Sequence, residues 1–199
     1  MSAKTKPTRI AIIGTGRLGS AAAYSLLLSP SISPSEILLC DPNLALLTAQ
    51  VADLADAAYA LNSNTAIRPA TYHEAGQCDI IIITAGSRHI GESVGSVAAM
   101  GRNASVVRSV VSGMAPVNKE AVVVVAAEPV DVMTGLARGM LAGVLEEGRV
   151  LGVGTYLESV RLRGMVAGEV GVSPCFFSPS HSFLLASVVF TICGLVVKV

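Results

Sequence analysis

Short apolar runs alternate along this chain with longer segments in which alanine and leucine recur at helical spacing. The apolar runs are rich in isoleucine, valine and leucine, which is typical of parallel strands covered on both faces. The predicted strands are the run that ends at Gly14, and Glu36–Asp41, Cys78–Gly86, Ala121–Ala127 and Arg149–Val153. The predicted helices are Ser20–Leu28, Asn43–Leu61, Ser93–Met114, Val130–Leu145 and Tyr156–Val170, and Thr71–Gln77 is predicted to be a polar connection. This alternation predicts an α/β fold with a doubly wound parallel sheet.

The turn after the first predicted strand has the sequence Gly14-Thr-Gly-Arg-Leu-Gly19. In such a turn the first glycine permits the tight bend, the second lets a pyrophosphate approach the backbone, and the third lets the helix pack on the strand. The helix N-terminus adds free N–H groups and a positive dipole end. Asp41 ends the next strand, about 20 residues later, where a carboxylate can bind a ribose 2′-hydroxyl. The pattern favours a Rossmann-type dinucleotide site over a glycine turn without a ligand, and Asp41 favours NAD over its phosphorylated relative.

Composition narrows the function further. Of the 199 residues, 52% are hydrophobic and 14% are charged, which suits a folded domain with a core. The formal net charge is zero and lysine and arginine do not cluster, so we expect no nucleic-acid partner. The four cysteines and three histidines share no metal-ligand spacing, and we expect no metal site. The N-terminal stretch has no apolar segment typical of a secretory signal, so we expect a cytoplasmic protein.

The composition changes at Ser173-Pro174, and the last 25 residues, 175–199, form an apolar tail that holds all four phenylalanines. Phe183–Val197 is almost uninterrupted in its hydrophobicity, but as a helix it would reach only about 22 Å, which is short of a bilayer core of about 30 Å. The short length disfavours a membrane anchor but leaves it as one interpretation. Three other interpretations of the tail stay open: a strand at the sheet edge beside Val150–Val153, a disordered tail, and sequence from a shifted reading frame. Its isoleucine, valine, phenylalanine and threonine residues favour a strand over a helix.

The motifs, taken in order, resemble those of the lactate/malate dehydrogenase family. They are Gly14–Gly19, Asp41, Val51-Ala-Asp-Leu54, Thr84-Ala-Gly-Ser-Arg88, Gly91-Glu-Ser93, Arg102-Asn103, Pro129-Val-Asp131 and Gly154-Thr-Tyr-Leu-Glu-Ser-Val-Arg161. The Gly-Glu-Ser and Gly-Thr-x-Leu-x-Ser-x-Arg patterns look more like the L-lactate dehydrogenase branch. The resemblance runs from about Ile10 to Pro174 and implies that residues 1–174 form the NAD-binding domain and that 175–199 lie outside the family. It also implies that the family's C-terminal substrate domain, which builds the substrate pocket and oligomer contacts, is lacking and the chain is truncated.

The family reaction is hydride transfer between NAD and a small 2-oxo or 2-hydroxy acid. Carried over residue by residue, the resemblance places Arg161 at the carboxylate-binding arginine, and Glu158 at the aspartate that orients the catalytic histidine. A glutamate keeps the charge but displaces it by one methylene. The implied cofactor-binding residues are Gly14, Gly16, Arg17, Leu18, Gly19, Asp41, Thr84, Ala85, Gly86 and Arg88.

Other catalytic positions depart from the family pattern. Val94 stands where an arginine should polarise the carbonyl, and Glu128 replaces an asparagine that contacts substrate and cofactor. The Gly-Glu-His-Gly motif that carries the catalytic histidine is missing. Losing the general acid alone costs about 10²–10⁴ in rate, and losing an electrostatic stabiliser costs about 3 kcal/mol. We therefore expect NAD binding with impaired catalysis.

Three other interpretations stay open. An active dehydrogenase would need His89 or His181 for proton transfer. A hydrolase would use Ser93, because Gly91-Glu-Ser-Val-Gly95 fits a nucleophile pattern, although this pattern does not follow its strand directly. A non-catalytic Rossmann domain would use its apolar tail to bind another chain. An oligomer is one form that such binding could take.

Overall fold

The computed structural model describes residues 8–29, 34–86 and 97–173. The chain divides into two units, Met1–Gly152 and Val153–Val199. The predicted domain boundary at residue 174 therefore lies beyond the end of the first unit. In the second unit the described element is one helix, α6 (Tyr156–Val170), which ends at Gly171 with a positive φ of 73°.

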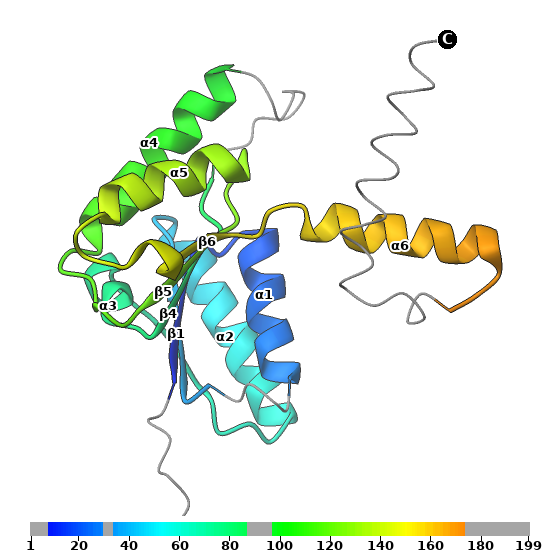
Figure 1. The fold of residues 1–199 in the computed structure, drawn as a ribbon. Coiled ribbons are helices and arrows are strands. Elements are labelled where there is room, and N and C mark those ends of the chain that lie inside the picture. Colours follow the sequence, from blue (N-terminus) through cyan, green and yellow to red (C-terminus); the bar gives the residue numbers. More distant parts are fainter. Residues whose placement is uncertain (1–7, 30–33, 87–96, 174–199) are drawn as a thin grey trace, which may run out of the picture. The chain divides into compact units, whose positions relative to one another are not determined.

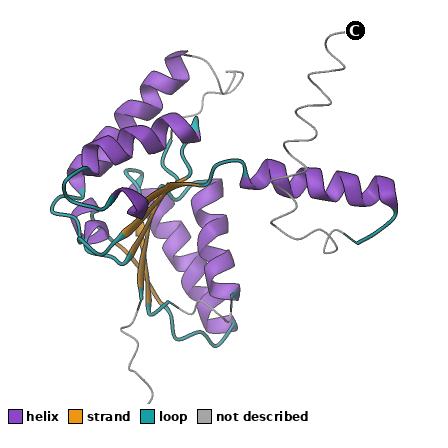
Figure 2. Cartoon of the chain, in the orientation of Figure 1, coloured by secondary structure: helices purple, strands orange, loops and turns teal. Residues whose placement is uncertain are grey.

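The first unit contains one parallel sheet with helices on both faces (Figures 1 and 2). Its strands are β1 (Arg9–Ile13), β2 (Glu36–Cys40), β3 (Ala66–Pro69), β4 (Ile80–Ile83), β5 (Val122–Val125) and β6 (Val150–Gly152). The spatial order is β3-β2-β1-β4-β5-β6, and every described pairing is parallel. This is the strand order of a dinucleotide-binding fold, so the predicted Rossmann-type sheet is confirmed.

The helices of this unit divide between the two faces of the sheet (Figure 1). Helices α1 (Arg17–Leu28) and α2 (Leu44–Ala60) cover one face, and α3 (Tyr72–Gly76), α4 (Val97–Gly113) and α5 (Val130–Leu141) cover the other. A short 3₁₀ turn, Glu147–Arg149, leads into β6. Among the residues that the structure describes, no helix combines the length and hydrophobicity that crossing a membrane would need.

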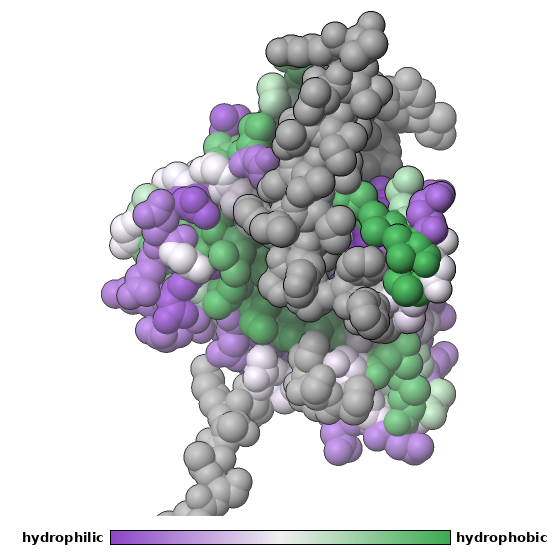
Figure 3. Space-filling view, turned by 45° about the vertical axis from the view of Figure 1, so that its right-hand side comes forward, coloured by the Kyte–Doolittle hydropathy of each residue, from purple (hydrophilic) through white to green (hydrophobic). Residues whose placement is uncertain are grey.

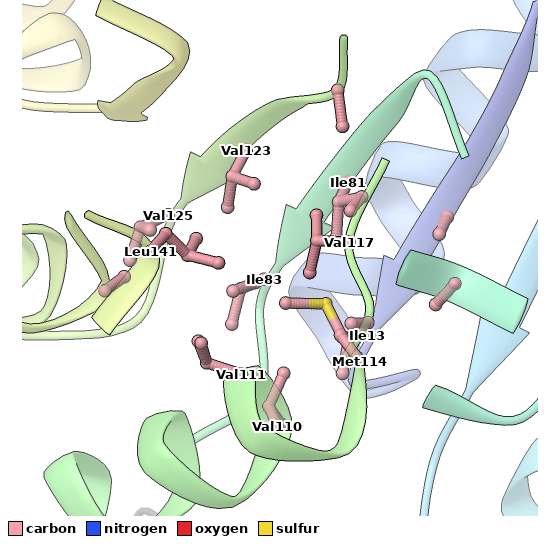
Figure 4. Close-up of a cluster of buried hydrophobic side chains, with 14 of the residues drawn as sticks. Ile13, Ile81, Ile83, Val110, Val111, Met114, Val117, Val123, Val125 and Leu141 are labelled. Carbon is pink, nitrogen blue, oxygen red and sulfur yellow. The ribbon is translucent and has the colours of Figure 1, made fainter. Parts of the chain in front are cut away.

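The core follows the alternation of side chains along β1. Ile10 and Ile12 pack with Ile37, Leu39 and α1 and α2 residues on one face. Ala11 and Ile13 point to the opposite face. Figure 4 shows that larger cluster, in which residues of β4 and β5 meet those of α4 and α5; it includes Ile81, Ile83, Val110, Val111, Met114, Val117, Val123, Val125 and Leu141. Burial on both faces explains why the strands are continuously apolar in sequence. On the face seen in Figure 3, apolar and polar residues are both exposed.

Two elements correct the predictions. The sequence predicts five strands before the tail, but the structure contains one more, β3, which pairs with β2. Its residues are half-buried or exposed, so the alternating or continuous apolar pattern that signals a strand is weak there. Thr71–Gln77 is not merely a polar connection, because it contains α3. A reciprocal capping box between Thr71 and Glu74 begins that helix.

The boundaries of the other helices also differ from those predicted. Helix α1 begins at Arg17, three residues before the predicted start, and α5 ends at Leu141 instead of Leu145. The predicted strand in the tail and the start of the predicted helix at Ser93 lie outside the described residues.

Candidate functional site: a nucleotide cradle at the carboxyl ends of the strands

The candidate site lies where β1 and β4 end side by side in the sheet. The chain leaves β1 for α1 on one face, whereas β4 precedes α4 on the other. Because the connections diverge, this edge is a topological switch point, which is where ligands bind in open α/β sheets. The glycine turn, Asp41 after β2 and Thr84–Gly86 after β4 all lie at this edge.

Gly14 and Gly19 hold the turn together by contacts that leave no room for a side chain. Gly14 has a φ of +99°, and a Cβ there would lie 2.7 Å from the backbone of Ala85. A Cβ at Gly19 would lie 1.9 Å from the Gly14 carbonyl oxygen and 2.9 Å from Oγ1 of Thr84. The Gly14 N–H donates to the Cys40 carbonyl at 2.8 Å, which joins the turn to β2.

Gly16 differs from the other two glycines because it faces open space. It is exposed, and nothing lies within 4 Å of the position that its Cβ would occupy. Its φ of −68° is accessible to any residue, so the turn itself does not require glycine there. An open backbone surface at this point fits the close approach of a diphosphate.

The N-terminus of α1 begins at this open surface. Gly16 is the N-cap and has no side chain with which to accept the first N–H groups. The first turn, which the structure describes completely, contains no acidic residue and exposes Arg17 and Leu18. The first N–H groups of α1 have no acceptor within the helix, and the guanidinium of Arg17 is nearby, so the start of the helix favours binding of an anion.

Asp41 is held at the carboxyl end of β2 by three hydrogen bonds. Its Oδ2 accepts from the backbone N–H of Thr15 at 2.8 Å and from the Thr15 hydroxyl at 3.1 Å. Its Oδ1 accepts from the Asn43 backbone N–H at 2.9 Å. Asp41 is half-buried, so its carboxylate is fixed but still reaches solvent.

Thr84 supports the glycine turn from the neighbouring strand. Its hydroxyl lies 2.7 Å from the Gly14 carbonyl oxygen and 3.1 Å from that of Ile13, and donates to this carbonyl pair. The hydroxyl proton is therefore engaged within the protein. Gly86 follows and is exposed, and a Cβ added to it would lie 3.5 Å from Oδ1 of Asn103 on α4. The Nδ2 of Asn103 donates to the Glu128 carbonyl at 2.7 Å. Asn103 thus connects the chain after β4 with the chain after β5.

The predicted catalytic residues fall in different parts of the chain. Glu158 and Arg161 are exposed on α6, in the second unit. Glu128 is exposed in the first unit, after β5. The predictions for Arg88, His89, Ser93, Val94 and His181 lie outside the described residues.

Two buried cysteines lie near the ends of strands, Cys40 at the end of β2 and Cys78 just before β4. Cys40 and Cys78 are free thiols in the core, as their apolar surroundings in the sequence indicate. Burial raises the pKa of Cys40 to about 12 and that of Cys78 to about 11, so neither is a thiolate near neutral pH. Within the described part of the chain, histidine, cysteine and carboxylate side chains form no group that could hold a metal ion.

Sequence reasoning missed two polar residues that build the site. Thr15 is 2% exposed and Asn103 is 8% exposed, and both bond to backbone or carboxylate groups of other elements. Thr15 could have been noticed as the polar residue between two glycines that faces an acid across the motif. Asn103 belongs to the Arg102-Asn103 motif, but no spacing in the sequence links it to residue 128.

Comparison with known proteins assigns this architecture to a family. The model of the lactate/malate dehydrogenase NAD-binding domain matches residues 8–152. Over 178 residues the chain is 39% identical to L-lactate dehydrogenase A of Rhizopus oryzae, covering 89% of this chain and 52% of that protein. Over 167 residues it is 34% identical to L-lactate dehydrogenase of Chloroherpeton thalassium, covering 83% and 52%.

Solved structures agree with that assignment. The minor L-lactate dehydrogenase of Enterococcus mundtii, in a ligand-bound form, superposes with a TM-score of 0.74 at 27% identity, over 84% of this chain and 52% of that one. Malate dehydrogenase of Salinibacter ruber shares the fold, with a TM-score of 0.72 at 23% identity, over 84% and 51%. The chain spans about half the length of the relatives that it matches.

Proposed function

Since the chain belongs to the lactate/malate dehydrogenase family and contains its NAD-binding domain, we propose that it binds NAD at the glycine turn as an L-lactate dehydrogenase-like domain with impaired catalysis. The observation that carries the NAD site is the open backbone at Gly16, beside the uncapped start of α1 and the fixed carboxylate of Asp41. Residues 1–174 are the proposed NAD-binding domain, and 175–199 are proposed to lie outside the family.

The cradle residues have separate tasks in this proposal. Gly16 and the N–H groups of the first α1 turn hold the diphosphate, with Arg17 beside them. Asp41 accepts a hydrogen bond from the adenosine ribose. Thr84–Gly86 would line the approach to the nicotinamide, and Arg88, which lies outside the described residues, would contact the cofactor phosphates. When bound, NADH supplies the hydride that the family reaction transfers to a 2-oxo acid.

The proposed impairment concerns the residues that should act on the substrate. Arg161 would bind the substrate carboxylate, and Glu158 would replace the orienting aspartate. Val94 cannot donate a hydrogen bond to a carbonyl, and the negative charge of Glu128 would oppose an anionic substrate. The chain spans about half the length of these relatives, and the family's Gly-Glu-His-Gly motif does not occur in its sequence. A cytoplasmic role in carboxylic acid metabolism is part of the proposal.

Turnover tests the impairment. With pyruvate and NADH at saturating concentrations, we expect this chain to be at least about 10²-fold slower than L-lactate dehydrogenase A of Rhizopus oryzae, because the general acid is lost. A double variant, His89→Ala with His181→Ala, should leave any residual rate unchanged. Turnover within tenfold of the relative, abolished in the double variant, would favour an active enzyme with a substitute histidine and refute the proposed impairment.

A further inference from the structure

Thr15, the residue between the first two glycines of the turn, contacts the carboxylate that the nucleotide site depends on. Its side chain is buried, with 2% of the residue exposed. Both its backbone N–H and its hydroxyl donate to the same oxygen, Oδ2 of Asp41, at 2.8 and 3.1 Å. Two donors from one buried residue hold that oxygen from two directions.

The other carboxylate oxygen of Asp41 is also engaged. The Asn43 N–H donates to Oδ1 at 2.9 Å, and the same Asn43 caps α2 by accepting from the Leu46 N–H. A carboxylate offers about four acceptor sites, so these contacts fill three of them. The donors are neutral, so the negative charge of Asp41 is oriented without being paired to a cation in these contacts.

We propose that Thr15 is a positioning residue that sets cofactor specificity, because its hydroxyl holds the Asp41 carboxylate in the rotamer that faces the adenosine ribose. The inference rests on the proposed NAD site, in which Asp41 accepts a ribose hydroxyl. A fixed carboxylate presents its remaining acceptor site to a 2′-hydroxyl at little entropic cost. The same fixed charge cannot turn away from a 2′-phosphate, so Thr15 and Asp41 together discriminate against the phosphorylated cofactor.

The hydroxyl is the part of Thr15 that matters in this inference. Valine has nearly the same shape but places a methyl group against Oδ2, whereas serine keeps the donor. In both variants the backbone N–H of residue 15 still donates to Asp41, so the carboxylate is not left without a partner there. If the cofactor affinities change when the hydroxyl is lost and not when only the bulk of the side chain is reduced, Thr15 acts by positioning the Asp41 carboxylate.

Calorimetric titration with NADH and with NADPH tests the inference on the full chain. For Thr15→Val we expect about fivefold weaker NADH binding and a smaller NADH-over-NADPH affinity ratio, and for Thr15→Ser we expect both to return towards the wild-type values. Thr48→Val is the matched control, because the exposed Thr48 only donates to the Leu44 carbonyl one turn earlier in α2. Its two affinities should equal those of the wild type.

Each result decides the inference. An unchanged affinity ratio in a folded Thr15→Val variant would overturn it while leaving the NAD site intact. Wild-type protein that binds neither cofactor would instead refute the proposed function and this inference with it. Where Thr15→Val is too unstable to titrate, Thr15→Ala removes the hydroxyl without the added methyl contact, and the same narrowing of the ratio is expected.

Discussion

At the scale of single residues, the cradle is defined by where side chains are absent. Gly14, Gly19 and Thr84 meet so closely that the carbonyl of Gly14 lies where a Cβ of Gly19 would be, and the Thr84 hydroxyl bonds to that same carbonyl. The contact brings the start of α1 against the ends of β1 and β4. The shape of the nucleotide site therefore depends on backbone packing before any ligand arrives.

A single methyl group at Gly19 should disrupt this packing. We expect Gly19→Ala to lose about 3 kcal/mol of unfolding free energy, because its Cβ would lie 1.9 Å from backbone that cannot move independently. For a chain of this size, that corresponds to a fall of roughly 6 °C or more in melting temperature, measured by circular dichroism.

Gly101→Ala provides the control for that substitution. Gly101 lies inside α4 with open space at its Cβ position, so alanine should raise stability by about 0.5–1 kcal/mol. Equal melting temperatures for Gly19→Ala and Gly101→Ala would show that the close contact at Gly19 does not constrain the fold.

The residues of the site differed in how far the sequence predicted them. The three glycines and Asp41 follow from spacing, because a tight turn and a ribose contact impose both residue type and distance along the chain. Thr15 and Asn103 escaped prediction because their partners, Asp41 and the Glu128 carbonyl, become neighbours only when strands pair. Thr84 was predicted as a site residue from its motif. The hydrogen bond from its hydroxyl to the Gly14 carbonyl, however, could not be predicted, because the two residues meet only in the folded sheet.

At the scale of elements, a chain of ion pairs joins the short edge strand β3 to the sheet. Glu36 on β2 bonds Arg9 on β1 at 2.8 Å and Arg68 on β3 at 2.6 Å, and Arg68 also bonds Glu74 of α3 at 2.9 Å. These cross-strand contacts stabilise a strand that buries little apolar surface. The polar and half-exposed character of β3 also explains why hydrophobic periodicity, which predicted the other five strands, missed it.

The pKa values of this network give a direction for its dependence on pH. Burial raises the pKa of Glu36, but hydrogen bonds from Arg68 and Arg9 outweigh that effect and leave its pKa below the ordinary value. The Thr71 backbone N–H, followed by Arg68, lowers the pKa of Glu74 to about 2. Lowered carboxyl pKa values mean that this stabilisation is complete above about pH 4.5 and is lost as the pH falls towards 2.

Replacing Glu36 should therefore change both stability and its acid dependence. At pH 7 we expect Glu36→Gln to lose about 1–2 kcal/mol, because two charge-assisted hydrogen bonds become neutral ones. Between pH 5 and pH 2.5 its melting temperature should fall less steeply than that of the wild type, because one of the carboxylates that must protonate is gone.

A carboxylate of a more exposed ion pair serves as the matched control. Glu120 pairs with Arg149 at 2.8 Å, but 79% of its side chain is exposed, so Glu120→Gln should change stability by less than about 0.5 kcal/mol. If Glu36→Gln and Glu120→Gln gave the same melting curves at every pH, the network around Glu36 would not hold β3 in the way described.

At the scale of the whole molecule, the described sheet and the family model cover the same part of the chain. The six described strands lie within Arg9–Gly152 and have the order of a dinucleotide-binding sheet. The family model ends at the same residue, Gly152, and the chain as a whole spans about half the length of its relatives. The fold and the NAD cofactor follow from this part of the chain.

Calorimetric titration of the chain with NADH measures whether the glycine turn binds NAD. We expect saturable binding at one site for the wild type and for Gly101→Ala. Gly16→Ala should fold normally, because its Cβ meets nothing within 4 Å, yet it should lose most of its affinity because the methyl group occupies the surface where the diphosphate lies. Wild-type protein without binding at millimolar NADH, or Gly16→Ala binding as tightly as the wild type, would contradict the account.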